Sequence, residues 1–314
     1  MTVDRMLLDL DLNLLVTLDA LLRERNVTRA AELLGCSQPT MSTGLGRLRR
    51  YFDDELLHRV GNRYELTPLA VTLAVRTPPA IEGVRRVFDL RSEFDPAKIE
   101  REFTIVTSDY AAAVFGPLMT RRVAERAPGV RLRFQQTSPA AVDNAQDMLR
   151  SVDGILLPHG FLADVPHTDL FEDRWVCIVD RDNPTIGDTI TLDQLQQAPW
   201  VVVFNRPTAF APATQQLRMI GVEPRVEVVV DGFLQMPFMV AGTARVAMLQ
   251  AHLASRLAEA AGVRVVECGF DVVPLAEAFW WHPMYRTDAA HTWLRELLVE
   301  TAGELRTDVP DTFR

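Results

Sequence analysis

The sequence is short of several features that whole classes of protein need. Only Lys98 is a lysine among the 33 basic residues, and 42 acidic residues leave a net charge of −9. A chain of this charge is not a general nucleic-acid binder, so any DNA contact requires a local basic patch. Cys36, Cys177 and Cys268 are odd in number and lie far apart without a CxxC spacing. This pattern disfavours both a disulfide framework and a zinc site.

Long apolar runs and a targeting signal are also lacking. No apolar run approaches the ~20 residues of a membrane span. The N-terminal stretch carries Asp4, Asp9 and Asp11, and it lacks the basic region and the cleavage site of a signal peptide. We therefore expect a cytoplasmic protein without membrane contact. The length of 314 residues and the 48% hydrophobic content indicate about two globular domains.

What is present begins with helical periodicity near the N-terminus. Leucines recur at helical spacing between residues 10 and 22, and that helix is expected to close near residues 25–26. Thr28 is the expected N-cap of a short second helix, and Gly35 is suited to the left-handed turn after it. Ser37 then caps a third helix, in which Pro39 is tolerated in the first turn.

The third helix has an apolar back and a polar front. The residues expected to face inward are Met41, Leu45, Leu48 and Phe52. The polar front consists of Gln38, Thr40, Ser42, Thr43 and Arg47. Residues 23–63 hold eight arginines and five acidic residues, a local charge of +3. This combination predicts a helix-turn-helix whose polar front suits base edges and whose arginines suit phosphates.

A wing and a long helix are expected next. Gly61-Asn62 is a hairpin turn signal, and Arg59 and Arg63 flank it where they can reach phosphates or the minor groove. Asp53, Asp54 and Glu55 are expected to form a solvated helix end rather than a catalytic pair. Another helix starts at Thr67-Pro68, and Thr77-Pro78-Pro79 is expected to interrupt it.

This N-terminal region resembles the winged helix-turn-helix of LysR-type transcriptional regulators. The runs "TRAAELLGCSQPTMS", "GRLRRYFDDELLHR" and "LTPLA" follow that family's order and spacing. The resemblance implies double-stranded promoter DNA as a partner, a homodimer formed through the linker helix, commonly a homotetramer, and RNA polymerase as a further partner. It places Gln38, Pro39, Ser42 and Thr43 against bases and backbone, and Arg59 in the wing. The full set of expected DNA-binding residues is Thr28, Arg29, Ser37, Gln38, Pro39, Thr40, Ser42, Thr43, Arg47, Arg59 and Arg63.

From Phe103 onward, short β-rich runs alternate with helical ones. Such alternation predicts an α/β domain with parallel sheets and helices on both faces, either as one large sheet or as two lobes. The region resembles the two-lobed, periplasmic-binding-protein-like effector domain of the same family, with crossover strands near residues 164–174 and 268–278. The runs "VDGILLP", "LFEDRWVCIVDRDNP" and "WWHPMYRTDAAHTWLREL" resemble its nodulation-regulator and aromatic-degradation branches.

These observations predict three parts of the chain. Residues 1–67 form the winged helix-turn-helix domain, with the helix-turn-helix at about 26–45. Residues 68–94 form a linker and dimerisation helix, and residues 95–314 form the effector-binding domain. Its first lobe is expected at about 100–168 and 279–314, and its second at about 169–278.

An effector is expected at strand ends of this domain, since open α/β sheets bind ligands there and helix starts favour anions. Thr107 and Ser108 end one strand beside backbone amides expected to be free. The other candidate residues are Leu157, Pro158, Phe204, Asn205, Asp231, Phe233 and Met248. An apolar wall with few polar groups predicts a small aromatic or carboxylated effector.

Other functions are less well supported. No nucleophile elbow, dinucleotide fingerprint or Walker loop is present, so we expect neither an enzyme nor a cofactor. His159, His167, Asp164 and Asp169 imitate a metal cluster, but their Gly- and Pro-containing segment favours a solvated loop. A solute-binding protein or an enzymatic α/β domain fused to a helix-turn-helix, and a ligand-independent DNA binder, stay as alternatives. The helix-turn-helix and the long α/β region favour an effector-responsive transcriptional regulator over these.

Overall fold

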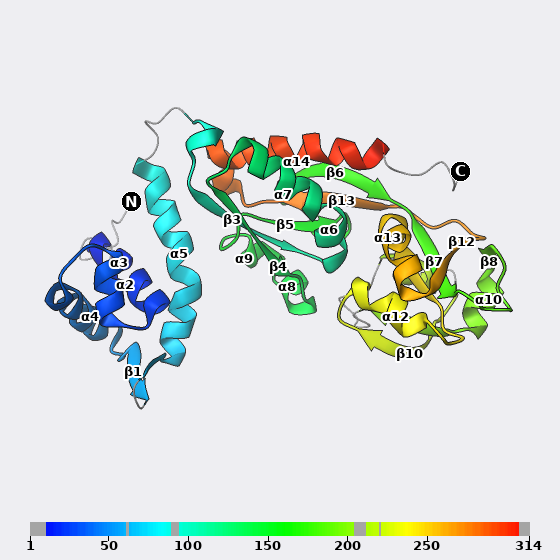
Figure 1. Ribbon diagram of the computed structural model, residues 1–314, viewed down its shortest axis with the longest axis horizontal. Helices are drawn as coiled ribbons and strands as arrows, with labels where there is room; N and C mark the ends of the chain where they lie inside the picture. The colour runs from blue at the N-terminus through cyan, green and yellow to red at the C-terminus, as the bar shows by residue number, and fades with distance from the viewer. Residues whose placement is uncertain (1–10, 61–62, 89–93, 204–211, 220, 308–314) are drawn as a thin grey trace. The chain divides into compact units, whose positions relative to one another are not determined.

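The computed structural model describes residues 11–60, 63–88, 94–203, 212–219 and 221–307 (Figure 1). The chain divides into two compact units, Met1–Glu93 and Phe94–Arg314. Each unit has its own hydrophobic core. Among the described residues, no helix combines the length and the apolar character that crossing a membrane requires.

The first unit is a helical bundle with a β-hairpin. Its described elements are α2 (Leu12–Glu24), α3 (Val27–Leu33), α4 (Gln38–Phe52), β1 (Leu57–Val60), β2 (Arg63–Leu66) and α5 (Pro68–Phe88). Leucines of α2 are buried against Met41, Leu45 and Leu48 of α4, as the helical periodicity predicts. Gly35 adopts a positive φ of +62° between α3 and α4, which is the left-handed turn of the helix-turn-helix. β1 and β2 pair antiparallel, and the predicted turn residues 61–62 lie outside the described residues.

Two local predictions in this unit are wrong. The N-cap of α3 is Asn26 rather than Thr28, because the Asn26 side chain accepts hydrogen bonds from the amides of Thr28 (2.9 Å) and Arg29 (3.1 Å). The second concerns α5, which runs through the Thr77-Pro78-Pro79 segment without interruption. Pro78 and Pro79 have no backbone N–H and therefore cannot donate helical hydrogen bonds. Next to them, the Thr77 hydroxyl adds a hydrogen bond to the Leu73 carbonyl at 2.8 Å.

The second unit begins with a five-stranded sheet in the order β4-β3-β5-β13-β6, which we call the first lobe. Its strands are β3 (Arg101–Thr107), β4 (Val130–Gln136), β5 (Gly154–Pro158), β6 (His167–Asp173) and β13 (Leu275–Trp280). Its helices are η1 (Pro96–Lys98), α6 (Asp109–Val114), α7 (Gly116–Arg126), α8 (Pro139–Asp143), α9 (Ala145–Met148), η3 (Pro283–Tyr285) and α14 (Ala289–Thr307). In Figure 1, α7 and α14 lie on one side of this sheet and α8 and α9 on the other.

The second lobe comprises the elements between β6 and β13. Its strands are β7 (Trp175–Asp180), β8 (Thr189–Ile190), β9 (Pro199–Val203), β10 (Arg225–Val230), β11 (Ala247–Gln250) and β12 (Val263–Cys268). Its helices are α10 (Leu192–Gln197), α11 (Pro212–Met219), η2 (Phe233–Gln235), α12 (Met236–Val240) and α13 (Ala251–Ala261). The sheet order is β11-β7-β12-β8, with β9 and β10 as a separate pair. The two-lobed α/β expectation is therefore confirmed.

The expectation of parallel sheets holds only in part. β3 is parallel to β4 and β5, but β13 is antiparallel to both β5 and β6. In the second lobe, β7 is antiparallel to β11 and β12. The antiparallel pairs of the first lobe arise because β13 returns to its sheet from the second lobe, instead of following a helical crossover within one sheet.

Two chain segments connect the lobes, and they differ in length. Arg174 alone separates β6 from β7, whereas residues 269–274 separate β12 from β13. The Arg174 guanidinium forms a bidentate ion pair with Glu267 of β12, which binds the short connection to the second lobe. Sequence analysis expected crossovers in these two places.

Candidate functional site

The start of α4 is stabilised by its own first residues. The Ser37 hydroxyl accepts a hydrogen bond from the Thr40 amide at 3.3 Å, and the hydroxyl oxygens of Ser37 and Thr40 lie 2.8 Å apart. Pro39 stands in the first turn, where a missing N–H costs nothing. These groups therefore order the helix start. The exposed hydroxyls of Ser37 and Thr40 already take part in hydrogen bonds within the protein, so a contact with DNA must be made in addition to those bonds.

The exposed front of α4 holds the side chains that are least engaged within the protein. Gln38 and Ser42 are exposed, and no hydrogen bond of their side chains occurs within the described part of the chain. The Thr43 hydroxyl instead donates to the Pro39 carbonyl at 2.9 Å. It therefore presents only acceptor positions outward, and guanine, whose major-groove groups are acceptors, is a poor partner for it. Gln38 and Ser42 are the better candidates for base contacts.

Gly44 explains how α4 can lie so close to α2. A Cβ atom at this position would come within 2.8 Å of the Thr17 Cγ2 atom, closer than van der Waals contact permits. Glycine here allows α4 to pack closely against α2. The close approach to Thr17 is the physical reason for a glycine at this position.

Arg47 and Arg29, both predicted to bind DNA, have partners within the protein. Arg47 forms an ion pair with Asp11 at 2.9 Å, and Asp11 also caps α2 through the Asn13 amide. The Asn13 amide and the Arg47 guanidinium both lower the pKa of the Asp11 carboxyl. Arg29 donates to the Glu24 carbonyl at 2.9 Å. Either arginine must exchange or share its partner to bind a phosphate.

The wing is supported by a residue that sequence analysis did not single out. Arg49 of α4 donates to the carbonyl of Glu55 at 2.8 Å and to that of Leu57 at 2.9 Å. Asp53 and Glu55 are exposed, as expected for a solvated helix end, but the half-buried Asp54 accepts from the Leu56 amide and from the Thr67 hydroxyl and is structural. These bonds fix the base of the hairpin on which Arg59 is exposed, with Arg63 on the paired strand.

The predicted effector residues Thr107 and Ser108 are buried and partly engaged. Ser108 is the N-cap of α6, and its hydroxyl oxygen accepts from the Ala111 amide at 3.1 Å. The Asp109 carboxylate accepts from the Tyr110 amide at 2.9 Å. The prediction of free amides at this helix start is therefore wrong, because the first turn is capped by its own side chains.

Asp109 also joins the two lobes. Its carboxylate accepts hydrogen bonds from the amides of Phe233 (3.0 Å) and Leu234 (2.9 Å) of η2. A Cβ atom on Gly232 would lie 2.4 Å from the Asp109 Oδ2 atom, so this approach requires glycine. The structure thus brings the strand end at Ser108 next to Phe233, as the sequence predicted, with Asp109 as the link that sequence analysis missed.

The remaining effector candidates lie in different surroundings. Met248 is buried in the main core of this unit, while Asp231 is exposed. Leu157 belongs to a separate cluster with Val106 and Trp280 that does not include Phe233, and Pro158, next to Leu157, is buried. Phe204 and Asn205 lie outside the described residues.

Where the lobes meet, the structure buries a group of polar side chains, which we call the buried junction. It consists of the half-buried His252 and five buried residues, Tyr110, Asp173, Trp175, Gln250 and Glu277. The Tyr110 hydroxyl donates to Asp173 at 2.8 Å, and His252 Nδ1 lies 3.0 Å from the same carboxylate oxygen. Burial and the nearby Asp173 charge raise the pKa of Tyr110 well above its ordinary value, which keeps its proton available for this bond.

Two further pKa shifts follow from this arrangement. The Asp173 carboxylate, which accepts a hydrogen bond from the protonated imidazole, raises the pKa of His252. Burial, followed by repulsion from Asp173, raises the pKa of Glu277 to about 8. Glu277 is therefore largely protonated at neutral pH, and its carboxyl group can donate as well as accept. A single carboxylate in the apolar run "LAEAFWW" was the signal in the sequence that could have identified it.

Several polar atoms of the buried junction have no hydrogen-bond partner among the described residues. Among them are Trp175 Nε1, Gln250 Oε1 and Glu277 Oε2. Trp175 and Gln250 are direct neighbours across the β7–β11 pair. An unpaired buried polar group costs about 1–3 kcal/mol of stability. Because several such groups lie together here, the buried junction is a candidate binding site for a polar ligand.

Comparisons with known proteins agree with the division of the chain into two parts. Residues 12–71 match the family model described as bacterial regulatory helix-turn-helix protein, lysR family. Residues 97–303 match the model described as LysR substrate binding domain. Between them the two models cover both units.

Individual relatives give the same picture. Nodulation protein D 2 of Rhizobium tropici is 36% identical over 298 residues, which is 94% of this chain and 93% of the relative. Nodulation protein D 1 of Mesorhizobium japonicum is 35% identical over 300 residues, 94% of each chain. The crystal structure of a probable transcriptional regulator from Pseudomonas aeruginosa is 31% identical with a TM-score of 0.73, covering 94% of this chain and 98% of that one.

Proposed function

The chain belongs to the LysR family of bacterial transcriptional regulators, and on that premise we propose how it reads DNA and responds to an effector. The family consists of regulators rather than enzymes. We propose that the front of α4 reads promoter DNA. A small aromatic or carboxylated effector bound at the buried junction then controls that contact.

On the DNA side, Gln38 and Ser42 contact base edges, and the other predicted residues position the helix. Gln38 is suited to adenine, since its amide can donate and accept at once. Arg59 and Arg63 bind phosphates beside the wing, and Arg29 and Arg47 join them after exchanging their internal carboxylate and carbonyl partners. The local charge of +3 over residues 23–63 supports this assignment.

The effector side rests on one observation, the unpaired polar atoms of the buried junction. Trp175 offers an N–H and the protonated Glu277 an O–H, and both suit the oxygens of a carboxylate. Tyr110 and Phe233, whose ring centroids are 6.3 Å apart, offer aromatic surface beside them. A ligand that binds one lobe arrangement better than another shifts the population of arrangements. Ser108 and Asp109 then act by ordering the junction instead of binding the effector carboxylate.

Several coarser features complete the proposal. α5 and the rest of residues 68–94 form the linker and dimerisation segment between the DNA-binding part (1–67) and the effector-binding part (95–314). The working form is a homodimer or homotetramer in the cytoplasm, where promoter DNA and RNA polymerase are its partners. A two-fold dimer binds two half-sites about one helical turn, or a multiple of it, apart.

A ligand screen with a matched pair of variants tests the effector site. We expect a panel of aromatic acids, tested by thermal shift, to yield a ligand that also changes the gel shift of the upstream promoter. Gln250→Met keeps the size of the buried side chain but removes its unpaired oxygen. It should weaken that ligand about tenfold while ligand-free DNA binding stays unchanged.

The exposed Gln196 of α10 supplies the control. Gln196→Met makes the same chemical change on the surface and should leave the affinity for the ligand at the wild-type value. A ligand that binds Gln250→Met as tightly as wild type would place the effector site elsewhere.

A further inference from the structure

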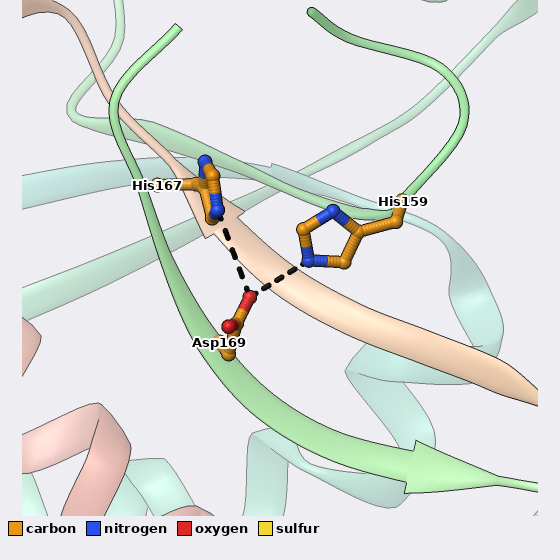
Figure 2. Close-up of side chains that lie close together, drawn as sticks. All are labelled: His159, His167 and Asp169. Carbon is orange, nitrogen blue, oxygen red and sulfur yellow. Dashed lines mark hydrogen bonds and ion pairs between the residues drawn. The ribbon is translucent and has the colours of Figure 1, made fainter.

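Two histidines and one aspartate of the first lobe converge on one point. The His159 Nε2 atom lies 2.7 Å and the His167 Nε2 atom 3.8 Å from the same oxygen, Oδ1 of Asp169. One ligand atom from each residue lies within 4.8 Å of the other two. Figure 2 shows both imidazole rings with a nitrogen directed at this carboxylate.

The sheet order explains this convergence. His167 and Asp169 are two residues apart on β6, so their side chains project from the same face of the strand. β13 lies between β6 and β5, and the chain leaves β5 at Pro158. The His159 amide then donates to the Ala276 carbonyl of β13 at 3.0 Å, which holds His159 beside the other two.

Trp280 of β13 forms a rigid floor under the two imidazole rings. Its ring centroid lies 4.6 Å from that of His167 and 5.3 Å from that of His159. The indole is buried, and its N–H donates to the Leu157 carbonyl at 2.8 Å. The floor limits how the imidazole rings can turn, which preorganises their nitrogens.

A backbone contact selects the form of His167 that can bind a metal. The His167 Nδ1 atom lies 3.2 Å from the Val165 carbonyl oxygen, which can only accept a hydrogen bond. Nδ1 therefore carries the proton, and in the neutral ring the lone pair is on Nε2, facing the Asp169 carboxylate. Metal-binding histidines are held by the same kind of bond from their second nitrogen to a carbonyl. The His167 Nε2 lone pair and the Asp169 Oδ1 atom both donate electrons, so a cation between them would be bound by both.

We propose that His159 Nε2, His167 Nε2 and Asp169 Oδ1 form a binding site for a divalent transition-metal ion. Two imidazoles and a carboxylate without a thiolate suit Zn²⁺, Ni²⁺, Co²⁺ or Cu²⁺ rather than Ca²⁺ or Cu⁺. Donor atoms around a tetrahedral Zn²⁺ stand about 3.3 Å apart, so small side-chain rotations complete the site. All three side chains are exposed, which leaves the remaining metal positions open to water or to a chelating small molecule.

This proposal reverses the expectation from sequence, which favoured a solvated loop. The three side chains are exposed, as expected. However, neighbouring strands bring them together, so the helical i, i+4 spacing that the sequence lacks is not needed. Asp164, the fourth residue of the apparent cluster, is not among the three converging residues. Its positive φ of +58° is a conformation that Asn adopts as readily as Asp, which makes it a useful control.

The test is titration of the full-length protein with Zn²⁺ alone, followed by calorimetry, with Co²⁺ as a spectroscopic probe. We expect one equivalent of Zn²⁺ to bind wild type, and a Co²⁺ spectrum without a thiolate charge-transfer band. Asp169→Asn and His167→Gln should each weaken Zn²⁺ binding at least about tenfold. Asp164→Asn, which removes a carboxylate from the same loop, should leave the affinity unchanged.

Three results would overturn the proposal. The first is no saturable Zn²⁺ binding by the wild-type protein, which would leave a hydrogen-bonded His–Asp pair only. The second is equal affinity of Asp169→Asn and wild type. The third is a thiolate band with Co²⁺, which would assign the ion to cysteine. Circular dichroism of each variant confirms that it is folded, so that lost binding reports on the site itself.

Discussion

Polar side chains serve opposite purposes in the two units of this protein. On α4 in the first unit, Gln38 and Ser42 are exposed, and their side chains contribute little to the fold. At the buried junction of the second unit, Tyr110, Asp173 and Glu277 are almost fully buried, and they bind or repel one another. The comparison teaches that at Gln38 and Ser42 binding is separable from stability, whereas at the buried junction the two are coupled.

The largest expected effect is on the stability of the second unit. Asp173→Ala leaves the Tyr110 hydroxyl and His252 without their common partner, and breaking a buried charged network costs about 3–5 kcal/mol. All five tryptophans lie in this unit, so tryptophan fluorescence during urea unfolding reports on it. Asp231→Ala, at an exposed position, is the control and should change the free energy of unfolding by less than about 0.5 kcal/mol. Equal effects of the two variants would mean that the buried junction contributes no more to stability than an exposed position does.

The pH dependence of stability sharpens the same point. The folded-state pKa of Glu277 is about 8, above its ordinary value of 4.5, so the folded protein holds this proton more tightly than the unfolded chain. The free energy of unfolding therefore falls as pH rises from about 5 to 8, by up to about 1.4 kcal/mol per pH unit from this group. Glu277→Gln should remove this slope, with a growing advantage over wild type toward pH 8. Parallel slopes for the two proteins would show that Glu277 ionises freely in the folded state.

In the first unit, an exposed side chain should change DNA affinity without changing stability. Gln38→Ala is expected to cost about 1–3 kcal/mol of binding at the specific site and to relax base preference there. Its free energy of unfolding should stay within about 0.5 kcal/mol of wild type. Quantitative gel shifts against specific and scrambled DNA measure this, with Gln196→Ala as the control. Unchanged specific binding would mean that the recognition face is assigned wrongly.

The smallest expected effect compares the same residue type in both units. Ser37 and Ser108 are both N-caps that accept a hydrogen bond from a first-turn amide. Replacing either by Ala should cost about 1 kcal/mol of helix stability. Ser37→Ala should also weaken DNA binding, because it caps the recognition helix, whereas Ser108→Ala should leave ligand-free DNA binding intact. A Ser108→Ala protein with altered DNA binding would show that the units are coupled without an effector.

The sequence predicted the DNA-binding face better than the effector site because the face is local. Residues 37–48 of one helix contain its cap, its apolar back and its polar front, and helical periodicity relates them directly. The packing at Gly44 and the Arg49 support of the wing required neighbouring elements to be placed first. So did the choice of Asn26 over Thr28 as the N-cap.

The buried junction and the proposed metal site were harder to predict because they are assembled from separate segments. Tyr110, Asp173 and Glu277 of the buried junction come from one helix and two strands far apart in the chain. The pairing of His159 with His167 depends on β13 lying between β5 and β6, an order that no local pattern reveals. For the same reason the antiparallel return of β13 was missed, although the individual strands were predicted.

The unequal connections between the lobes restrict how the effector-binding unit can move. A rotation of one lobe against the other must pass through the φ and ψ angles of Arg174 on one side, while residues 269–274 can follow by distributing the change over many bonds. We therefore expect any such rotation to centre on the one-residue connection, which the ion pair with Glu267 holds to the second lobe. A hinge of this kind converts a small change at the buried junction into a directed displacement instead of a general loosening.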